Sequence, residues 1–303
     1  MSFEIKTYYL KKKKKAFQFL KDELGLSMKE AQKLIDRERL LVNGNVVRKK
    51  SALIKGEIGV IQFVPQTRGL QPLFQTPDFA LFDKPSGVLI HPRNRHTEYS
   101  LTHEIKYLFG QRANITHRID KETSGLVIAA KNSITEKRIK LAFEKREIKK
   151  GYLAFVRGKL QKELFIDEPI LKNRDFSNVK LKVYIHPEGK SAQTFVQPIR
   201  YFPEYNATLI EALPLTGRQH QIRLHLFHVK HPILGDPIYG VDTKIAADYL
   251  DGLLTEEERM KYTGAPRLML HANWIDFIYK GHYKIYSQYD FTNDLHLCQK
   301  KPL

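Results

Sequence analysis

The sequence predicts an α+β fold in which a small N-terminal α/β module precedes a mixed, mostly antiparallel sheet. Three observations support this fold class. Segments with the pattern of strands outnumber helical segments, and they alternate poorly with helices, which argues against a parallel sheet. Positive charge is densest at the start, where residues 1–65 contain 15 Lys or Arg and 7 Asp or Glu. With 303 residues the chain is long enough for two domains.

The N-terminal module, residues 1–65, is predicted to contain two helices. Phe17, Leu20 and Leu24 recur at helical spacing. Ser27, with Glu30 three residues later, has the capping-box signature of a second helix.

A small β-structure is predicted after these helices. Leu41–Val47 is expected to form a hairpin, because Asn43-Gly44 suits its turn. Gly56-Glu57 predicts a second turn, followed by a strand over residues 58–64. The run Lys11–Lys15 is interpreted either as a solvated helix end or as a phosphate-binding segment.

Residues 66–77 are predicted to be a linker because they are rich in Pro and Gly, and a larger domain is expected over residues 78–303. Its predicted strands lie at residues 79–82, 126–130, 152–156, 194–196 and 207–210, and its predicted helices at 133–146 and 245–261.

Composition narrows the classes of function. The net charge is +18, which favours a polyanionic partner, nucleic acid above all, over a role in solubility alone. The single cysteine, Cys298, excludes a disulfide framework and multi-cysteine metal sites. No apolar run approaches the roughly 18 residues that would cross a bilayer, and the start lacks the pattern of a signal peptide. We therefore expect a cytoplasmic protein that binds no membrane.

Metal and cofactor motifs are incomplete. His220, His225, His228 and His231 cluster in the sequence, but no carboxylate or cysteine set completes a familiar metal site. Packing and hydrogen bonding are therefore the favoured roles for these histidines, and no metal is expected.

Two blocks of the larger domain carry charged candidate residues. Asp120 lies between two strand-like segments, where it either caps a β-turn or serves as a nucleophile or base held ionised by a cation. Thr216 is predicted to cap a helix on which His220, Arg223 and Phe227 share one face. Arg223 is either a surface arginine of this helix or a half-buried cation that needs a partner, for which Asp120 is the candidate.

Tyr152 is the candidate residue of a third block. It interrupts an otherwise apolar strand, from Tyr152 to Val156. The residue is either a core tyrosine or a platform on which a base stacks.

The larger domain resembles RluA-type pseudouridine synthases. Six stretches follow the order of that family: FDKPSGVLIHP (82–92), HRIDKETSGLVIAAK (117–131), KKGYLAFVRG (149–158), GKSAQTFV (189–196), TGRQHQIRLHLFHVKHPILGDPIYG (216–240) and RLMLHA (267–272). The departures are mild, with Ile119 in place of the usual Leu and Gln219 in place of Thr or Ser. The N-terminal stretches KEAQKLIDRERLLVNGNVV and KGEIGVIQF resemble the S-four-like RNA-binding domain.

The resemblance implies the pseudouridine synthase fold and three catalytic residues. Asp120 would be the nucleophile, Arg223 would pair with it, and Tyr152 would stack on the uracil and is the candidate acceptor of the proton at carbon 5. The implied substrate-binding residues are Arg118, which fills the stack that the target uridine leaves, His117, the apolar Leu126 and Ile222, and Lys29, Lys33 and Arg37 on the N-terminal module.

The implied reaction breaks the bond from ribose to nitrogen 1 of uracil and remakes it to carbon 5. It neither gains nor loses atoms, so we expect no cofactor. The expected partner of a monomeric enzyme is RNA, with large-subunit ribosomal RNA ahead of transfer RNA. Two alternatives remain: a non-catalytic RNA-binding or ribosome-assembly protein on the same fold, and a hydrolase that uses Asp120 as a general base.

Overall fold

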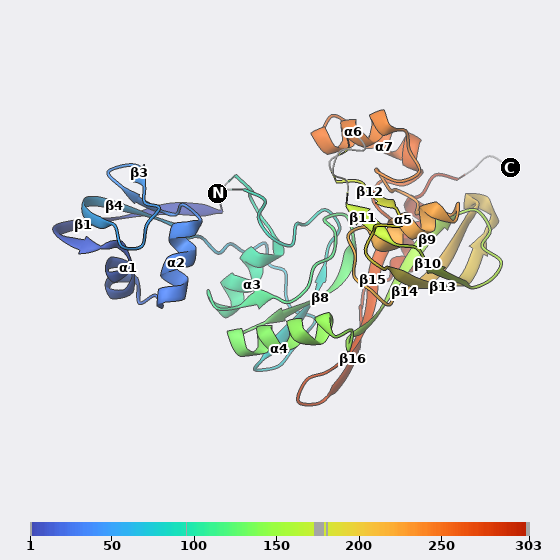
Figure 1. Cartoon of the computed structure of the whole chain (residues 1–303). Helices are drawn as coiled ribbons and strands as arrows, with labels where there is room; N and C mark the ends of the chain where they lie inside the picture. Colours follow the sequence, from blue (N-terminus) through green and yellow to red (C-terminus); the bar gives the residue numbers. More distant parts are fainter. Residues whose placement is uncertain (1, 95, 173–178, 180, 301–303) are drawn as a thin grey trace. The chain divides into compact units, whose positions relative to one another are not determined.

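The computed structural model describes residues 2–94, 96–172, 179 and 181–300. The chain divides into two compact units (Figure 1). The first combines Met1–Arg68 with His91–Tyr107, and the second combines Gly69–Ile90 with Leu108–Leu303. Residues 91–107, which the sequence placed in the larger domain, thus contact mainly the N-terminal residues.

The first unit contains a four-stranded antiparallel sheet in the order β1-β4-β2-β3, covered by two helices. Its elements are β1 (Phe3–Lys15), α1 (Ala16–Leu24), α2 (Met28–Asp36), β2 (Leu40–Val42), β3 (Asn45–Val46) and β4 (Leu53–Phe63). Phe19, Leu20 and Ile35 of the helices pack with Leu40 and Ile58 of the strands. The predicted capping box is present, since the Ser27 hydroxyl accepts from the Glu30 N–H and the Glu30 carboxylate accepts from the Ser27 N–H.

Two local predictions for this unit were wrong. Gly56-Glu57 is not a turn, because β4 runs through it and Gly56 pairs with Leu10. The pairing shifts register between Leu10 and Lys14, and Gly56 has a positive φ of 94°, so the glycine serves a bulge instead of a chain reversal. Lys11–Lys15 is the end of β1, so the interpretation of this run as a helix end was wrong, whereas phosphate binding by it stays a prediction. The hairpin around Asn43-Gly44 was predicted correctly.

Residues 91–107 pack within the first unit through α3 (Leu101–Phe109) and the segment before it. The rings of Phe63 and His103 lie 4.5 Å apart. Glu104 accepts hydrogen bonds from the Arg68 N–H, at 2.8 Å, and from the Tyr99 hydroxyl, at 2.5 Å. These contacts join the end of β4 and the segment after it to a helix that lies 40 residues further along the chain.

The second unit is built on a mixed sheet to which the described residues contribute ten strands, with β10-β13-β14-β9-β15-β8-β6-β5 as its main path, and with β16 beside β15 and β7 beside β8. The strands are β5 (Phe74–Gln75), β6 (Phe79–Lys84), β7 (Asn114–Ile115), β8 (Ser124–Ala130), β9 (Lys149–Arg157), β10 (Leu164–Asp167), β13 (Gln193–Phe202), β14 (Ala207–Pro214), β15 (Leu270–Ile278) and β16 (His282–Tyr286). Only the β15–β8 pair is parallel among these described strands, which confirms the predicted mixed, mostly antiparallel sheet.

Helices and a two-stranded sheet complete the unit (Figure 1). They are α4 (Ser133–Glu144), β11 (Ile170–Lys172), β12 (Val183–Ile185), α5 (Gln221–His228), α6 (Thr243–Asp251) and α7 (Glu256–Thr263), together with 3₁₀ turns at Pro203–Tyr205 and Phe291–Leu297. Ile139 of α4 packs into a core with Phe79, Leu126, Ile128 and Phe277. Within the described ranges, no helix is long and apolar enough to cross a membrane.

The five predicted strands lie within β6, β8, β9, β13 and β14, but three boundary predictions were wrong. The predicted linker contains β5, which pairs with β6. The single helix predicted at 245–261 is two helices, because α6 ends at the left-handed Gly252 and Thr255 caps α7. Thr216 caps no helix, since α5 begins only at Gln221 and the Thr216 hydroxyl binds the Gln221 side chain at 2.7 Å.

The parallel contact of β8 with β15 requires a glycine. Gly125 has a φ of 107°, and a Cβ atom there would lie 2.3 Å from the Ala272 carbonyl oxygen. Only glycine therefore allows the two backbones to approach this closely. Because Gly125 follows Asp120 by five residues, the close approach also fixes where the Asp120 turn enters the sheet.

Candidate active site

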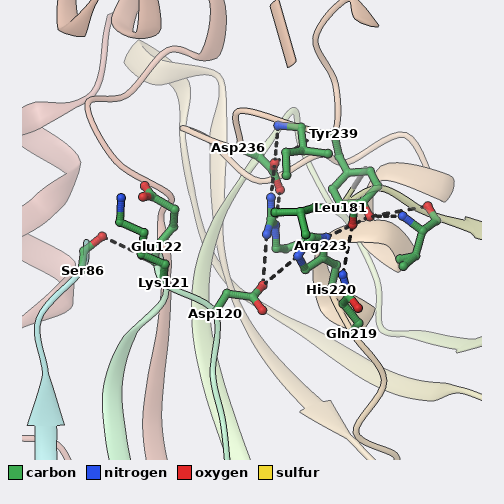
Figure 2. Close-up of polar contacts among 12 residues, drawn as sticks. Ser86, Asp120, Lys121, Glu122, Leu181, Gln219, His220, Arg223, Asp236 and Tyr239 are labelled. Atoms are coloured by element: carbon green, nitrogen blue, oxygen red, sulfur yellow. Dashed lines mark hydrogen bonds and ion pairs between the residues drawn. The ribbon is translucent and has the colours of Figure 1, made fainter. Parts of the chain in front are cut away.

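Asp120 lies on the turn between β7 and β8. The segment that follows β6 forms hydrogen bonds with the backbone of this turn. The Ser86 hydroxyl donates to the Glu122 carbonyl at 2.6 Å, and the Gly87 N–H donates to the Lys121 carbonyl at 3.0 Å (Figure 2). These bonds fix the backbone directly after Asp120.

Lys84 strengthens the same attachment. Its side chain is fully buried, and its ammonium group donates to the carbonyls of Pro85, Val88 and Lys121 at 2.8–3.0 Å. Burial lowers the pKa of Lys84 to about 7, although the nearby charges of Glu122 and Asp120 act to raise it. The lysine therefore ties the Asp120 turn to the end of β6 without a carboxylate partner.

Arg223 of α5 joins two carboxylates. Its Nη1 lies 3.0 Å from Asp120 Oδ2, while Nε and Nη2 bind the two oxygens of Asp236 at 2.7 and 2.8 Å (Figure 2). The side chains of Arg223 and Asp236 are 3% and 1% exposed. Burial acts to lower the pKa of Arg223, but Asp236 and then Asp120 hold it well above its usual value, so the guanidinium stays charged.

Asp236 is held in turn by its own loop. Its Oδ1 accepts the backbone N–H groups of Ile238 and Tyr239 at 2.9 and 3.0 Å. The sequence had not singled out Asp236, although it lies within the matched stretch 216–240. A carboxylate in a loop has no periodic spacing that would place it beside Arg223, and the GDPIYG stretch was its only signal.

His220 occupies the other side of Asp120. Its Nε2 lies 3.8 Å from Asp120 Oδ2, and its Nδ1 lies 3.2 Å from the Tyr239 hydroxyl, which accepts from the Val183 N–H at 3.0 Å. Burial, with Arg223 as the next cause, lowers the pKa of His220 to about 4. His220 is therefore a neutral imidazole at neutral pH.

The Asp120 carboxylate stays ionised although it is largely enclosed. Its side chain is 25% exposed. Burial acts to raise its pKa, but His220, Arg223 and Arg118 together hold the pKa below its usual value. Because His220 is neutral above pH 4 or so, the Arg223 guanidinium is the charge in contact with Asp120 at neutral pH.

Tyr152 lies on β9, between Ala212 of β14 and Ala272 of β15. It is 7% exposed, and none of the described residues forms a hydrogen bond with its hydroxyl. Burial, and then the charge of Asp120, raises the pKa of Tyr152. The phenol is therefore protonated and lies within the electrostatic influence of Asp120.

A cavity of about 850 Å³ brings most of the predicted site residues together. Its lining includes His117, Arg118, Asp120, Tyr152, Ile222 and Arg223. Eight Lys or Arg side chains and two acidic side chains, Asp120 and Glu144, line it among the described residues. The cavity therefore favours an anionic or strongly polar occupant.

Two of the predicted substrate-binding side chains are already engaged with the protein. The His117 ring packs 4.5 Å from that of Phe143, and its Nε2 accepts the Ile128 N–H at 3.0 Å. Leu126 is not part of the cavity lining and packs in the core beside Phe79 and Ile128.

The three basic residues predicted on the N-terminal module are exposed. Lys29 and Lys33 lie on α2, and Arg37 follows its last residue. They belong to the first unit, whereas the cavity belongs to the second.

The clustered histidines form hydrogen bonds. His225 is buried, with Nδ1 2.9 Å from the Thr194 hydroxyl and Nε2 3.0 Å from the Glu168 carbonyl. His231 Nδ1 lies 2.8 Å from the Arg157 carbonyl. Over the described part of the chain, no group of three or more His, Cys, Asp or Glu side chains is placed to hold a metal ion.

Comparison with known proteins identifies the family of the chain. The profile of the RNA pseudouridylate synthase family matches residues 78–228. An RNA pseudouridine synthase of Helicobacter pylori (strain J99 / ATCC 700824) is 39% identical over 289 residues, which cover 95% of this chain and 96% of that protein. Ribosomal large subunit pseudouridine synthase D of Escherichia coli (strain K12) is 31% identical over 217 residues, which cover 67% of this chain and 65% of that protein.

Solved structures show the same fold. Human RNA pseudouridylate synthase domain containing 1 superposes with a TM-score of 0.61 at 22% identity, covering 79% of this chain and 92% of that chain. Human RNA pseudouridylate synthase domain containing 4 gives a TM-score of 0.57 at 22% identity, covering 74% and 91%.

Fold and sequence together define an RNA-modifying enzyme with a pseudouridine synthase domain. The chain belongs to the RNA pseudouridine synthase family. It is therefore an isomerase that converts uridine to pseudouridine in RNA.

Proposed function

We propose that this enzyme isomerises specific uridines in structured RNA, with Asp120 as the nucleophile. The observation that carries the proposal is the ion pair of Asp120 with Arg223 at the wall of a basic cavity. A carboxylate can act as a nucleophile only when it is ionised, and Arg223 keeps Asp120 in that state at neutral pH.

The target uridine must leave its stack to reach this cavity, at a cost of about a few kcal/mol. Arg118 is exposed and lines the cavity, so it can fill the vacated place by stacking. Tyr152 and Ile222 offer aromatic and apolar surface to the uracil ring. His117 supports this wall through its contact with Phe143.

Lys150 is suited to the phosphate of the same nucleotide. It lies two residues before Tyr152 on β9, lines the cavity, and forms no ion pair with the described residues. Burial lowers its pKa. An anionic phosphate oxygen would offset the cost of this enclosed cation.

In the proposed reaction Asp120 attacks either the sugar or the uracil ring, the bond from C1′ to N1 breaks, and a bond from C1′ to C5 forms. The bond between Asp120 and the substrate breaks again in the same sequence, which restores the free carboxylate. The proton at C5 is then released. A protonated phenol can take up this proton only by passing its own to a neighbouring acceptor, and the Asp120 carboxylate is the candidate. Atoms and electrons balance within the RNA, because the released proton is replaced at N1 from solvent.

The proposed substrate is large-subunit ribosomal RNA, with transfer RNA second, and the proposed enzyme is a cytoplasmic monomer. The name of the Escherichia coli relative supports the choice of ribosomal RNA. Exposed Lys29, Lys33 and Arg37 on the first unit would add contacts to the RNA backbone. Mapping pseudouridines in RNA from cells that lack the protein would identify the modified position.

Release of tritium from RNA labelled at uridine carbon 5 tests the chemistry. We expect Asp120→Asn to abolish release and to leave RNA affinity within a few-fold of the parent, because the nucleophile contributes little to docking. Glu144→Gln, which also removes one carboxylate from the cavity lining, should keep most of the activity. More than about a tenth of parental activity in Asp120→Asn, roughly 1.4 kcal/mol of barrier, would contradict the nucleophile assignment.

The same assay separates two other functions. A non-catalytic RNA-binding protein would bind the RNA and release no tritium. A hydrolase would cut the RNA, whereas a synthase leaves the chain intact.

A further inference from the structure

Helix α7 contacts both loops that carry the carboxylates of the site. Arg259 Nη2 lies 2.7 Å from Glu122 Oε2 and 3.2 Å from the Gly235 carbonyl oxygen. Glu122 is the second residue after Asp120, and Gly235 directly precedes Asp236. One guanidinium therefore connects the neighbours of the two carboxylates that Arg223 binds.

The ion pair between Arg259 and Glu122 is largely buried. The two side chains are 13% and 11% exposed. Tyr249 of α6 also hydrogen-bonds Glu122, and its ring lies 5.4 Å from Arg259 Cζ. A buried ion pair contributes little to stability compared with apolar packing, but it fixes the geometry of the groups that it joins. The pair is therefore suited to positioning the Asp120 turn.

The second loop is bound by α7 through both backbone polar groups of one residue, Gly235. The Gly235 N–H donates to the Thr263 carbonyl at 3.0 Å, and the Gly235 carbonyl accepts from Arg259. Gly235 has a φ of 76°, and a Cβ atom there would lie 1.7 Å from the Arg267 carbonyl oxygen. Only glycine therefore allows the loop before Asp236 to pass this close to the Arg267 backbone, while its two hydrogen bonds attach it to α7.

We propose that Arg259 is a positioning residue that sets the distance between the Asp120 turn and the Asp236 loop. Arg223 can bind both carboxylates only when these two segments are correctly spaced. Arg259 is not among the described residues that line the cavity, and the hydrogen bonds of its guanidinium are to Glu122 and Gly235, so it acts through these two residues. This inference rests on the proposed role of Asp120.

The test compares Arg259→Gln, Arg259→Lys, Glu122→Gln and the Arg259→Gln/Glu122→Gln double variant with the parent, using full-length protein. In Arg259→Gln we expect kcat to fall roughly ten-fold while RNA affinity stays within about two-fold, as for residues that act through others. Arg259→Lys keeps a cation beside Glu122 and should recover most of the activity. The double variant should be no slower than the slower single variant, because both changes remove one interaction.

Arg157→Gln is the matched control. Arg157 also donates to a carbonyl of α7, that of Tyr262, at 3.5 Å, but it reaches neither loop. Melting temperatures of all variants show how much stability each change removes. Equal losses of kcat in Arg157→Gln and Arg259→Gln would overturn the proposal, as would a multiplicative loss in the double variant or parental kcat in Arg259→Gln.

A second measurement does not depend on turnover. The pKa of the Asp120 carboxyl can be followed by its ¹³C resonance in aspartate-labelled protein, with the assignment made from Asp120→Asn. Loss of Arg259 should loosen the contact with Arg223 and raise this pKa toward the usual value of an aspartate. An unchanged pKa in Arg259→Gln would overturn the positioning role. Absence of tritium release by the parent would instead contradict the proposed function.

Discussion

Arg223 Nη1 and Asp120 Oδ2 are 3.0 Å apart, although 103 positions separate the two residues in the chain. The other edge of the same guanidinium is bound by Asp236 through two hydrogen bonds. Arg223 is therefore oriented by Asp236 and presents its free Nη1 to Asp120. The partly exposed Asp120 carboxylate therefore lies beside a guanidinium whose orientation is fixed by Asp236.

Replacing this neighbour should change the pH dependence of the reaction. In the parent, the lowered pKa of Asp120 keeps the carboxylate ionised into the acid range, and activity is lost as pH falls through that pKa. Arg223→Met removes the cation, so the pKa of Asp120 rises. Activity is then lost at a higher pH than in the parent. Arg223→Lys should retain a profile closer to the parent. The measurement is kcat/KM from pH 8 down to the acid pH at which the parent loses activity, and identical profiles in parent and Arg223→Met would contradict the pairing.

Asp236→Asn should reduce stability more than a surface change does. Arg223 is 3% exposed, so loss of the negative charge leaves a buried cation with Asp120 as its one remaining carboxylate partner among the described residues. Breaking such a pair costs about 3–5 kcal/mol. Urea denaturation measures the free energy of unfolding, and tritium release should fall in the same variant because Arg223 loses its orientation. A loss of less than about 1 kcal/mol would show that the buried Arg223 guanidinium does not need the negative charge of Asp236.

Tyr152→Phe separates stacking from the hydroxyl. The ring keeps its place between Ala212 and Ala272, so RNA affinity should stay within about two-fold. If the hydroxyl relays the proton from C5, turnover should fall about 100-fold or more. Single-turnover tritium release measures this step. Normal turnover would reduce Tyr152 to a stacking platform.

Lys84 predicts a dependence of stability on pH. Burial lowers its folded-state pKa from 10.5 to about 7, so between these values the unfolded chain binds more protons than the folded protein. The free energy of unfolding contributed by Lys84 must therefore rise with pH across that window. The difference in unfolding free energy between the parent and Lys84→Met should increase from pH 7.5 to 9.5. A constant difference would mean that the lysine stays charged when buried.

The first unit should contribute to RNA affinity through charge. Changing Lys29, Lys33 and Arg37 to Gln should flatten the slope of log K against log salt by roughly 2 to 3, since each lost phosphate contact removes roughly 0.7–0.9. All three side chains are exposed, so the fold should be retained.

The control for this variant is a change of three exposed lysines of the second unit, Lys137, Lys162 and Lys244, to Gln. It removes the same charge from another surface. Equal effects of the two triple variants on the slope would mean that the first unit adds only to the net charge.

Local signals in the sequence predicted local structure well. The capping box at Ser27 and the hairpin at Asn43-Gly44 depend on residues a few positions apart, so their chemistry is visible in the sequence. The left-handed glycines were harder to interpret. Gly56 forms a bulge and Gly252 separates two helices, and a glycine with positive φ is compatible with a turn, a bulge or a helix end.

The site was predictable where a family motif marked it and not where contacts alone define it. Asp120 and Arg223 lie in matched stretches, and the expected contact between them is present. Asp236 lies in the same matched stretch as Arg223 but was not singled out, and Arg259 lies outside the matched stretches; both meet their partners through the folding of the chain. Their spacing in the chain carries no sign of those contacts.

The path of the chain through the first unit has a consequence for how this protein can be divided. The backbone enters the second unit after Arg68, returns for His91–Tyr107, and leaves again. A cut near residue 65 would remove the Phe63 ring from His103, and would separate residues 91–107 from most of the unit to which they belong. The first unit therefore cannot be separated from the rest of the protein by a single cut in the chain. A chimera that exchanges this unit between two relatives would have to replace residues 91–107 together with residues 1–68.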